Sequence, residues 1–256
     1  MVRIIKATTR AHEYELRAKH LKDDYQLAGD GPRSTAFRID KVLRLVDFQP
    51  GDRVLDISAG KGLLFDRIHA RVRECVGTDV SPALVERVAS RFADRPNVRF
   101  VCAMACKLPF EDASFDKITM TGAFLLQETV EECLQSLAEI RRVAKPGATI
   151  FISDIAIVEE WSLVPPPLST WGRLRRRFQQ DGIVQLPSSL LRYGLQRLRV
   201  MLEIEPIIIP SEHSLVFPDV VFVEMCRKNG LQARGFPTEE VTGTSLSRWD
   251  YLIKPV

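Results

Sequence analysis

The stretch VLDISAGKG, residues 54–62, decides the expected fold of this chain. An aliphatic run reaches an acid, Asp56, and then gives way to small residues and two glycines. A strand that ends in a glycine-rich turn before a helix brings the backbone close to a ligand, and the helix N-terminus offers free N–H groups to an anionic end. The stretch therefore predicts a loop that binds a nucleotide or a related cofactor.

Two common nucleotide loops do not fit the spacing of this stretch. A P-loop would need glycine in place of Leu55 and serine or threonine in place of Gly62. The NAD fingerprint G-x-G-x-x-G, started at Gly60, would place its third glycine at Phe65, where close packing of helix on strand requires a small residue. ATP hydrolysis is not expected, and an NAD-dependent reductase is kept as an alternative.

A second acid follows the next expected strand. In VGTDVS, residues 76–81, Asp79 stands at the strand end. A carboxylate in this place can accept hydrogen bonds from both ribose hydroxyls of an adenosine, which a phosphorylated ribose would not allow. Asp79 could also be an ordinary acid ahead of the helix start Ser81-Pro82. We favour the ribose role because Asp79 follows a strand and lies downstream of the glycine loop.

The alternation of short β-branched runs with longer amphipathic runs predicts a parallel sheet flanked by helices. The clearest helix is 129–144, which repeats apolar residues at three- and four-residue spacing and is expected to end at Pro146-Gly147. Strands are expected at 53–57, 74–79, 98–102, 116–120, 148–153, 231–236 and 249–254, and further helices at 34–46 and 218–229.

The expected fold class is α/β, a Rossmann-like, doubly wound, mostly parallel seven-stranded sheet with a helical lid insertion. We expect residues 1–50 to form an N-terminal flap and a first helix, and 51–154 the cofactor-binding core. We expect 155–215 to be the inserted lid and 216–256 to complete the sheet.

The lid contains a basic stretch, 171–199, with seven arginines against the single acid Asp181. Such a stretch could simply cover the pocket, or it could contact a membrane surface or attract an anionic or lipid-linked acceptor. Both interpretations stay open.

Composition narrows the possible partners. The net charge of +3, from 36 basic and 33 acidic residues, is too balanced to indicate nucleic acid binding. The five cysteines form no C-x-x-C pair, which favours a reduced, cytoplasmic protein, and the four histidines, His12, His20, His69 and His213, show no metal-binding spacing. No run approaches the roughly 18 apolar residues of a membrane span. No metal, secretion or membrane insertion is expected, and oligomerisation is left open.

Four motifs, in their order and spacing, resemble the class I S-adenosylmethionine-dependent methyltransferases. They are VLDISAGKG (54–62), VGTDVSPALVERV (76–88), LPFEDASFDKI (108–118) and EIRRVAKPGATIFISD (139–154). The chain resembles in particular the small-molecule group that includes the ubiquinone-biosynthesis methyltransferases. The resemblance covers residues 35–154 well and 217–254 loosely.

The resemblance implies S-adenosylmethionine as cofactor and in-line methyl transfer to a hydroxyl, carbon or amine of a small-molecule acceptor. It also implies roles for individual residues. The methionine part would lie among Asp56, Ser58, Ala59, Gly60 and Gly62, the ribose on Asp79, the adenine against Val80, Met104 and Ala105, and the sulfonium above Thr121 and Gly122. Two residues depart from the family's pattern, since the family usually has glycine in place of Ser58 and an acid in place of Met104.

The acceptor pocket is expected to be built from the flap and from the loops that follow the strand ends. Methyl transfer is a direct displacement that depends mainly on alignment, so no catalytic triad is expected, although a base helps where the acceptor is a hydroxyl. An alternative is a cofactor-binding partner subunit that has lost catalysis. Expected substrate contacts are Tyr14, Tyr25, Phe124, Gln127 and Trp161, and the candidates for taking the acceptor proton are His213, Asp154 and Glu128.

Overall fold

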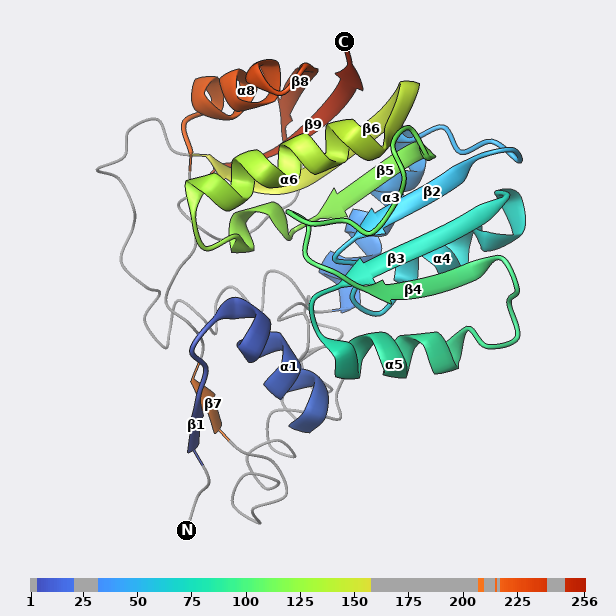
Figure 1. Cartoon of the computed structure of the whole chain (residues 1–256), viewed down its shortest axis with the longest axis vertical. Helices are drawn as coiled ribbons and strands as arrows, with labels where there is room; N and C mark the ends of the chain where they lie inside the picture. Colours follow the sequence, from blue (N-terminus) through green and yellow to red (C-terminus); the bar gives the residue numbers. More distant parts are fainter. Residues whose placement is uncertain (1–3, 21–31, 158–206, 210–214, 216, 239–246) are drawn as a thin grey trace.

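A seven-stranded sheet forms the centre of the molecule (Figure 1). The computed structural model describes residues 4–20, 32–157, 207–209, 215, 217–238 and 247–256. The strand order is β4-β3-β2-β5-β6-β9-β8, and β9 runs antiparallel to both of its neighbours while the other pairs are parallel. This confirms the expected α/β, doubly wound class. The strands are β2 (Arg53–Ile57), β3 (Glu74–Asp79), β4 (Val98–Cys102), β5 (Phe115–Thr121), β6 (Ala144–Ile157), β8 (Leu231–Pro237) and β9 (Ser247–Pro255).

Helices cover both faces of the sheet, and alternate side chains of β2 pack against the helices of opposite faces. Leu55 and Ile57 belong to one buried cluster, which α6 and α8 cover, whereas Val54 points to the opposite cluster beneath α3, α4 and α5. This alternation follows from the two-residue period of a strand. The helices are α1 (Arg10–His20), α3 (Pro32–Leu45), α4 (Leu63–Ile68), α5 (Pro82–Arg91), α6 (Val130–Val143) and α8 (Asp219–Lys228), with short 3-10 turns η1 (His69–Arg71) and η2 (Phe124–Leu126).

Side-chain caps fix where two of these helices begin. Ser81 Oγ accepts a hydrogen bond from the N–H of Leu84 at 3.1 Å and opens α5, with Pro82 in the first turn. Thr129 Oγ1 accepts from the N–H of Glu132 at 3.1 Å and opens α6. Both caps stand just after a strand-to-helix loop, so they place those loops at the carboxyl edge of the sheet.

Most expected bounds agree with the structure to within a few residues, and the largest difference concerns β6. This strand begins at Ala144, directly after α6, instead of at 148, because Ala144 already pairs with Phe115 of β5. Pro146 and Gly147 therefore lie inside a strand, and α6 ends before them. The pairing of β6 with β9 also shifts register between Ile152 and Ile155.

The N-terminal segment makes contacts that the sequence did not predict. Strand β1 (Ile4–Lys6) pairs in parallel with β7 (Ile207–Ile209), so the expected flap joins the end of the expected insertion. Helix α1 then packs against α5 (Figure 1). Most of the expected lid, including the basic stretch 171–199, lies outside the described residues.

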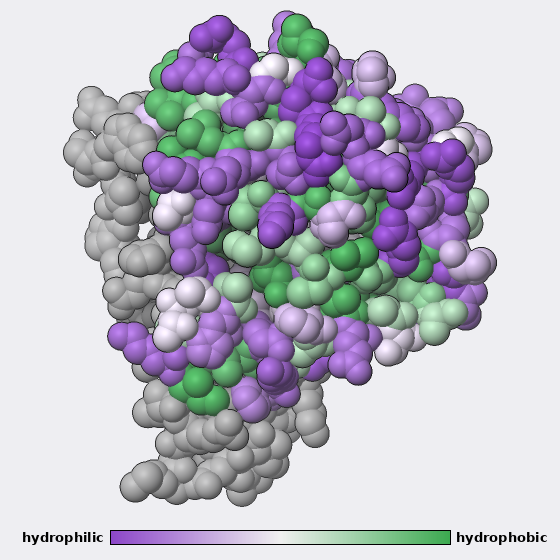
Figure 2. Space-filling model, in the orientation of Figure 1, coloured by the Kyte–Doolittle hydropathy of each residue, from purple (hydrophilic) through white to green (hydrophobic). Residues whose placement is uncertain are grey.

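The surface on the side shown in Figure 2 is mostly polar, and apolar residues gather between α6 and α5. Among the described helices none has the length and apolar character needed to cross a bilayer.

Candidate active site at the carboxyl edge of the sheet

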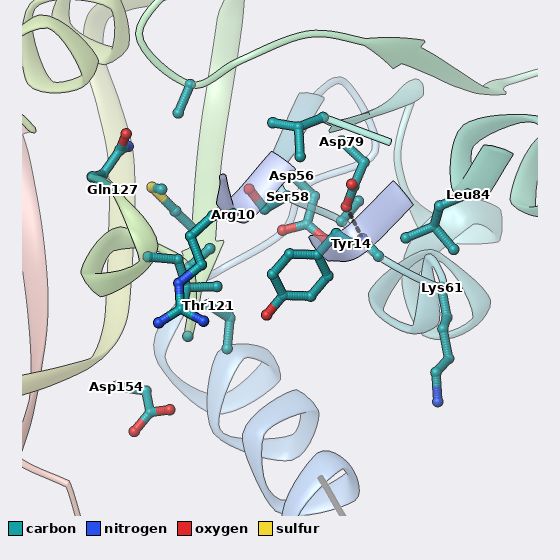
Figure 3. Close-up of a pocket in the computed structure, with 18 of the residues that line it drawn as sticks. Arg10, Tyr14, Asp56, Ser58, Lys61, Asp79, Leu84, Thr121, Gln127 and Asp154 are labelled. Carbon is teal, nitrogen blue, oxygen red and sulfur yellow. Dashed lines mark hydrogen bonds between the residues drawn. The ribbon is translucent and has the colours of Figure 1, made fainter. Parts of the chain in front are cut away.

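A cavity of about 530 Å³ lies at the carboxyl ends of β2, β3 and β5 and beside Asp154 of β6 (Figure 3). Open α/β sheets bind ligands at this edge. Residues of α1 and α3 line the cavity opposite the strand ends. The cavity therefore lies between the sheet and the N-terminal helices.

Asp56, in β2, is the most deeply placed carboxylate of the cavity. It is 7% exposed, and Oδ1 accepts a hydrogen bond of 2.7 Å from the hydroxyl of Thr119 in the neighbouring strand β5. Burial raises the pKa of Asp56 to about 7, the charge of Asp79 adds to the increase, and the Thr119 hydrogen bond opposes it. A ligand cation beside Asp56 would favour its ionised form.

Asp79, the last residue of β3, connects the glycine loop to the start of α5. Its Oδ2 accepts from the N–H of Gly60 and its Oδ1 from the N–H of Ser81, both at 3.2 Å. Burial raises the pKa of Asp79, although the backbone hydrogen bonds lower it. The carboxylate is thus held in a fixed orientation at the cavity wall, with lone pairs left for further donors.

The loop after β2 contains an unusual serine. Ser58 has φ of 58°, in the left-handed region that glycine adopts without steric cost. This gives the physical reason why glycine suits the position. Ser58, Ala59 and Gly60 all line the cavity.

Gly62 lies outside the cavity lining and serves packing instead. Its φ is 68°, and a Cβ built there would lie 2.8 Å from the Phe100 ring and 3.0 Å from the Phe92 ring. Phe65, where a dinucleotide fingerprint needs its third glycine, is fully buried with its ring centroid 5.6 Å from that of Phe100. The loop is therefore built for a different cofactor from NAD.

The expected adenine end is apolar. Val80, Met104 and Ala105 line the cavity together with Leu84 of α5. Met104, which replaces the family's usual acid, is 45% exposed. One carboxylate, Glu132, reaches the cavity lining from α6, and its Oε2 accepts from the N–H of Glu128 at 2.8 Å.

Asp154 lies across the cavity from Asp79 (Figure 3). Its φ is 63°, and it falls within the register shift between β6 and β9. Nη1 of Arg38 lies 3.8 Å from Asp154 Oδ2, and Nη1 of Arg248 lies 3.5 Å from Oδ1. Gly122 faces the same carboxylate, because a Cβ there would lie 3.4 Å from Oδ2.

Helix α1 lines one side of the cavity with Arg10, Ala11 and Tyr14. The N–H of Arg10 donates to Oε1 of Glu128 at 2.6 Å, which joins the start of α1 to the loop after β5. Tyr14 lies in the cavity near Asp56 in Figure 3, and burial raises the pKa of its phenol. Lys61 points away from these groups.

The structure brings together most of the expected site residues. Of the cofactor set, every residue except Gly62 lines the cavity, and so do the acids Asp154 and Glu128 and the substrate candidates Tyr14 and Gln127. His213, Tyr25 and Trp161 lie outside the described residues.

Phe124 differs from its expected role as a substrate contact. It is fully buried, and its ring makes an edge-to-face contact with Phe222, with 5.2 Å between centroids. An aromatic ring gains more from the core beneath η2 than from the open cavity.

Sequence reasoning missed several lining residues. Thr35, Arg38, Ile39 and Val42 share one face of α3 at three- and four-residue spacing, a signal that the sequence did carry. Arg10, Leu84, Glu132 and Arg248 also line the cavity. Among the residues that the structure describes, no group of three or more His, Cys, Asp or Glu side chains is placed to hold a metal ion.

Comparison with known proteins identifies relatives of the central part of the chain. Residues 54–147 match the protein family described as Methyltransferase domain. A demethylmenaquinone methyltransferase of Clavibacter sepedonicus is 38% identical over 140 residues, which are 54% of this chain and 54% of that protein. The chain thus spans about half the length of the curated relatives it matches.

Two solved structures share the fold. A SAM dependent methyltransferase from Aquifex aeolicus superposes with a TM-score of 0.54 at 20% identity, over 90% of this chain and 98% of that one. The [4+2]-cyclase SpnF superposes with a TM-score of 0.65 at 17% identity, over 99% of each chain. Residues 54–147 thus match a methyltransferase domain, and the chain shares the fold of a solved SAM dependent methyltransferase.

Proposed function

We propose that this chain transfers the methyl group of S-adenosylmethionine to a small-molecule acceptor of the quinone type, in its hydroquinone form. One observation carries the proposal. A single cavity brings the glycine loop, Asp56 and Asp79 together with two further carboxylates, Glu128 and Asp154, on the acceptor side.

The cofactor fits the charges of the cavity. S-adenosylmethionine carries an ammonium and a sulfonium cation, and Asp56 offers a buried carboxylate that a cation would stabilise. We assign the ammonium to Asp56, with the loop of Ser58, Ala59 and Gly60 around the methionine part.

The nucleoside is assigned to the next strand. Asp79 is oriented by two backbone N–H groups and would accept hydrogen bonds from the ribose hydroxyls. The adenine would then pack against Val80, Met104 and Ala105, since a thioether fills irregular apolar space readily. The sulfonium would lie at Thr121 and Gly122.

The reaction needs alignment more than a strong catalytic group. The acceptor atom forms its bond to the methyl carbon while the carbon–sulfur bond breaks and its electron pair stays on sulfur. Alignment alone contributes on the order of 7–11 kcal/mol. A base that takes the acceptor proton adds about 10²- to 10⁴-fold, and Asp154 and Glu128 are the described candidates, while His213 stays a prediction.

The acceptor class comes from the matched relative. Its name states that it methylates demethylmenaquinone, and the acceptor side of this cavity includes Tyr14 and Gln127, which can contact an aromatic ring and its oxygens. Contact with a membrane surface through 171–199, a cytoplasmic location and an oligomeric state stay predictions.

Isothermal titration with S-adenosylhomocysteine, followed by assay of methyl transfer to 1,4-naphthohydroquinone, tests the proposal. We expect saturable binding of the cofactor product and methylation of the hydroquinone. Absence of heat and of thermal protection would rule out a cofactor site. Binding without transfer to this acceptor or to any acceptor in a cell extract would favour the alternative of an inactive partner subunit.

A further inference from the structure

We infer that Arg38 and Arg248 form an oxyanion site for the acceptor, with Asp154 between them as the group that takes the acceptor's proton. The inference rests on the proposed function and specifies its acceptor side, since it requires an acceptor with an ionisable ring hydroxyl. Three separate features of the described residues carry it.

The first feature is the backbone of Asp154. A non-glycine residue with φ of 63° is strained, and strain of this kind persists only where the surroundings enforce it and gathers at functional sites. The surroundings here do enforce it. The N–H of Asp154 donates to Asp250 Oδ1 at 3.0 Å, and its carbonyl accepts from Arg248 Nη1 at 3.0 Å.

The second feature is a buried ion pair behind this residue. Nζ of Lys41, from α3, lies 2.7 Å from Oδ2 of Asp250, and the two side chains are 3% and 0% exposed. Breaking such a pair leaves an uncompensated buried charge, so separating Lys41 from Asp250 is costly. Asp250, held by this ion pair, in turn holds the backbone N–H of Asp154.

The third feature is the pair of arginines. Arg38 and Arg248 come from α3 and β9, and both line the cavity. Their Nη1 atoms lie 3.8 Å and 3.5 Å from the carboxylate oxygens of Asp154, the distances of ion pairs. A guanidinium keeps its charge at any pH that the protein survives. Two such groups around one carboxylate create a region that stabilises a negative oxygen entering from the cavity.

The proton transfer leaves the net charge of the group formed by the acceptor, Asp154 and the two arginines unchanged. The acceptor's O–H bond breaks, its proton goes to the Asp154 carboxylate, and the electron pair stays on the acceptor oxygen. One negative charge thus moves between two positions that the same guanidiniums face, which costs less than creating it in an apolar site.

The phenolate then makes its neighbouring ring carbon nucleophilic. That carbon forms a bond to the methyl group, the carbon–sulfur bond breaks, and the pair remains on sulfur. The ring carbon loses its proton to solvent, and the ring oxygen recovers a proton from Asp154. The net products are the methylated ring, S-adenosylhomocysteine and one proton.

Titration of 4-nitro-1-naphthol bound to the complex with S-adenosylhomocysteine tests the inference, because the anion of this naphthol is coloured. We expect the wild-type complex to lower the pKa of the bound naphthol by about one unit, which is about tenfold more anion at a given pH. Arg38→Gln and Arg248→Gln should each reduce that shift while S-adenosylhomocysteine still binds. Arg248→Lys should keep part of it.

Asp154→Asn separates this role from a structural one. Asparagine tolerates the left-handed backbone, so the fold should persist. Removing the competing carboxylate should increase the anion fraction of the bound naphthol. Methyl transfer to 1,4-naphthohydroquinone, a weaker acid, should fall near neutral pH, where its proton must still be taken, and should recover as the pH rises. Arg234→Gln, at an exposed residue of β8, is the matched arginine control. It should change neither the anion fraction of the bound naphthol nor the rate of methyl transfer.

An unchanged or raised naphthol pKa in the wild-type complex would overturn the inference, as would arginine variants that leave the shift intact. Failure of the proposed function looks different, because S-adenosylhomocysteine would then not bind, or would bind while the wild-type protein methylates no acceptor, whatever the pKa of the bound naphthol.

Discussion

The hydroxyl of Thr119 donates a hydrogen bond of 2.7 Å to Oδ1 of Asp56, from one parallel strand to its neighbour. This contact holds the carboxylate at the floor of the cavity, where burial works against its charge and the hydrogen bond supports it. The balance leaves the pKa of Asp56 at about 7. Cofactor binding should therefore depend on pH near neutrality.

We predict that the affinity for S-adenosylhomocysteine rises from pH 6 to pH 8. The ligand's ammonium favours ionised Asp56, so below pH 7 binding must first remove a proton, which costs up to about tenfold in affinity per pH unit. Titrations in buffers of different ionisation enthalpy would detect the released proton. Asp56→Asn should bind more weakly and lose this pH dependence, and a wild-type affinity that is flat over the range would contradict the assignment.

The raised pKa of Asp56 has the opposite effect on the stability of the free protein: cofactor affinity rises with pH, whereas stability falls. The pKa of Asp56 is raised above the ordinary value of 3.8, so between these values the folded state binds more protons than the unfolded state. The contribution of Asp56 to the free energy of unfolding therefore falls as the pH rises from about 4 to 7. Thermal unfolding of wild type and Asp56→Asn across this range would measure the difference.

Asp79→Ala should weaken binding of S-adenosylhomocysteine by about 1–3 kcal/mol, the usual cost of leaving buried donors unpaired. The variant removes acceptors from the ribose and also from the N–H groups of Gly60 and Ser81. Calorimetric titration gives the affinity, and Asp94→Ala, an exposed acid after α5, is the control. Equal affinities in the two variants would exclude the ribose role.

Ser58→Gly should stabilise the free protein. A left-handed backbone costs a non-glycine residue about 1–2 kcal/mol, and the entropy that glycine loses on folding offsets about 0.5–1 kcal/mol of the gain. Ala113→Gly is a matched control, because Ala113 has φ of 48° at an exposed turn outside the cavity. Both variants should melt at higher temperature, and only Ser58→Gly should also alter cofactor affinity. Destabilisation by both would show that the backbone is not strained there.

The sheet was predictable because its signals are local. The strand bounds of β2, β3 and β4 follow from short β-branched runs between turn residues, and the glycine loop with Asp56 and Asp79 lies within 26 residues of sequence. The Rossmann-like class then follows from the alternation of strands and helices alone.

The acceptor side was not predictable in the same way, because distant segments meet there. Arg38 and Arg248 approach Asp154 from α3 and β9, and no local pattern indicates that meeting. The left-handed Asp154 depends on a register shift between two strands about a hundred residues apart. The pairing of β1 with β7 is likewise non-local and involves strands too short to carry a period.

Hydrogen bonds between helix α1 and the start of α5 are expected to slow release of the cofactor. Oε2 of Glu15 accepts from the hydroxyl of Ser81 at 2.5 Å and from the N–H of Ala83 at 3.2 Å, and the guanidinium of Arg87 donates to the carbonyl of Ala18. These contacts hold α1, from which Tyr14 lines the cavity, against the start of α5, next to the end of β3 where we place the ribose.

Glu15→Ala should therefore loosen α1 and speed the dissociation of S-adenosylhomocysteine, with a loss of affinity of about 1 kcal/mol for the lost hydrogen bonds. Stopped-flow displacement gives the dissociation rate, and hydrogen exchange reports the opening of α1. Lys19→Ala is the matched control, because it removes only the exposed ion pair of Lys19 with Glu15 and leaves the contacts to Ser81 and Ala83. If both variants release the ligand at the wild-type rate, α1 does not gate the cavity and the ligand leaves by another side.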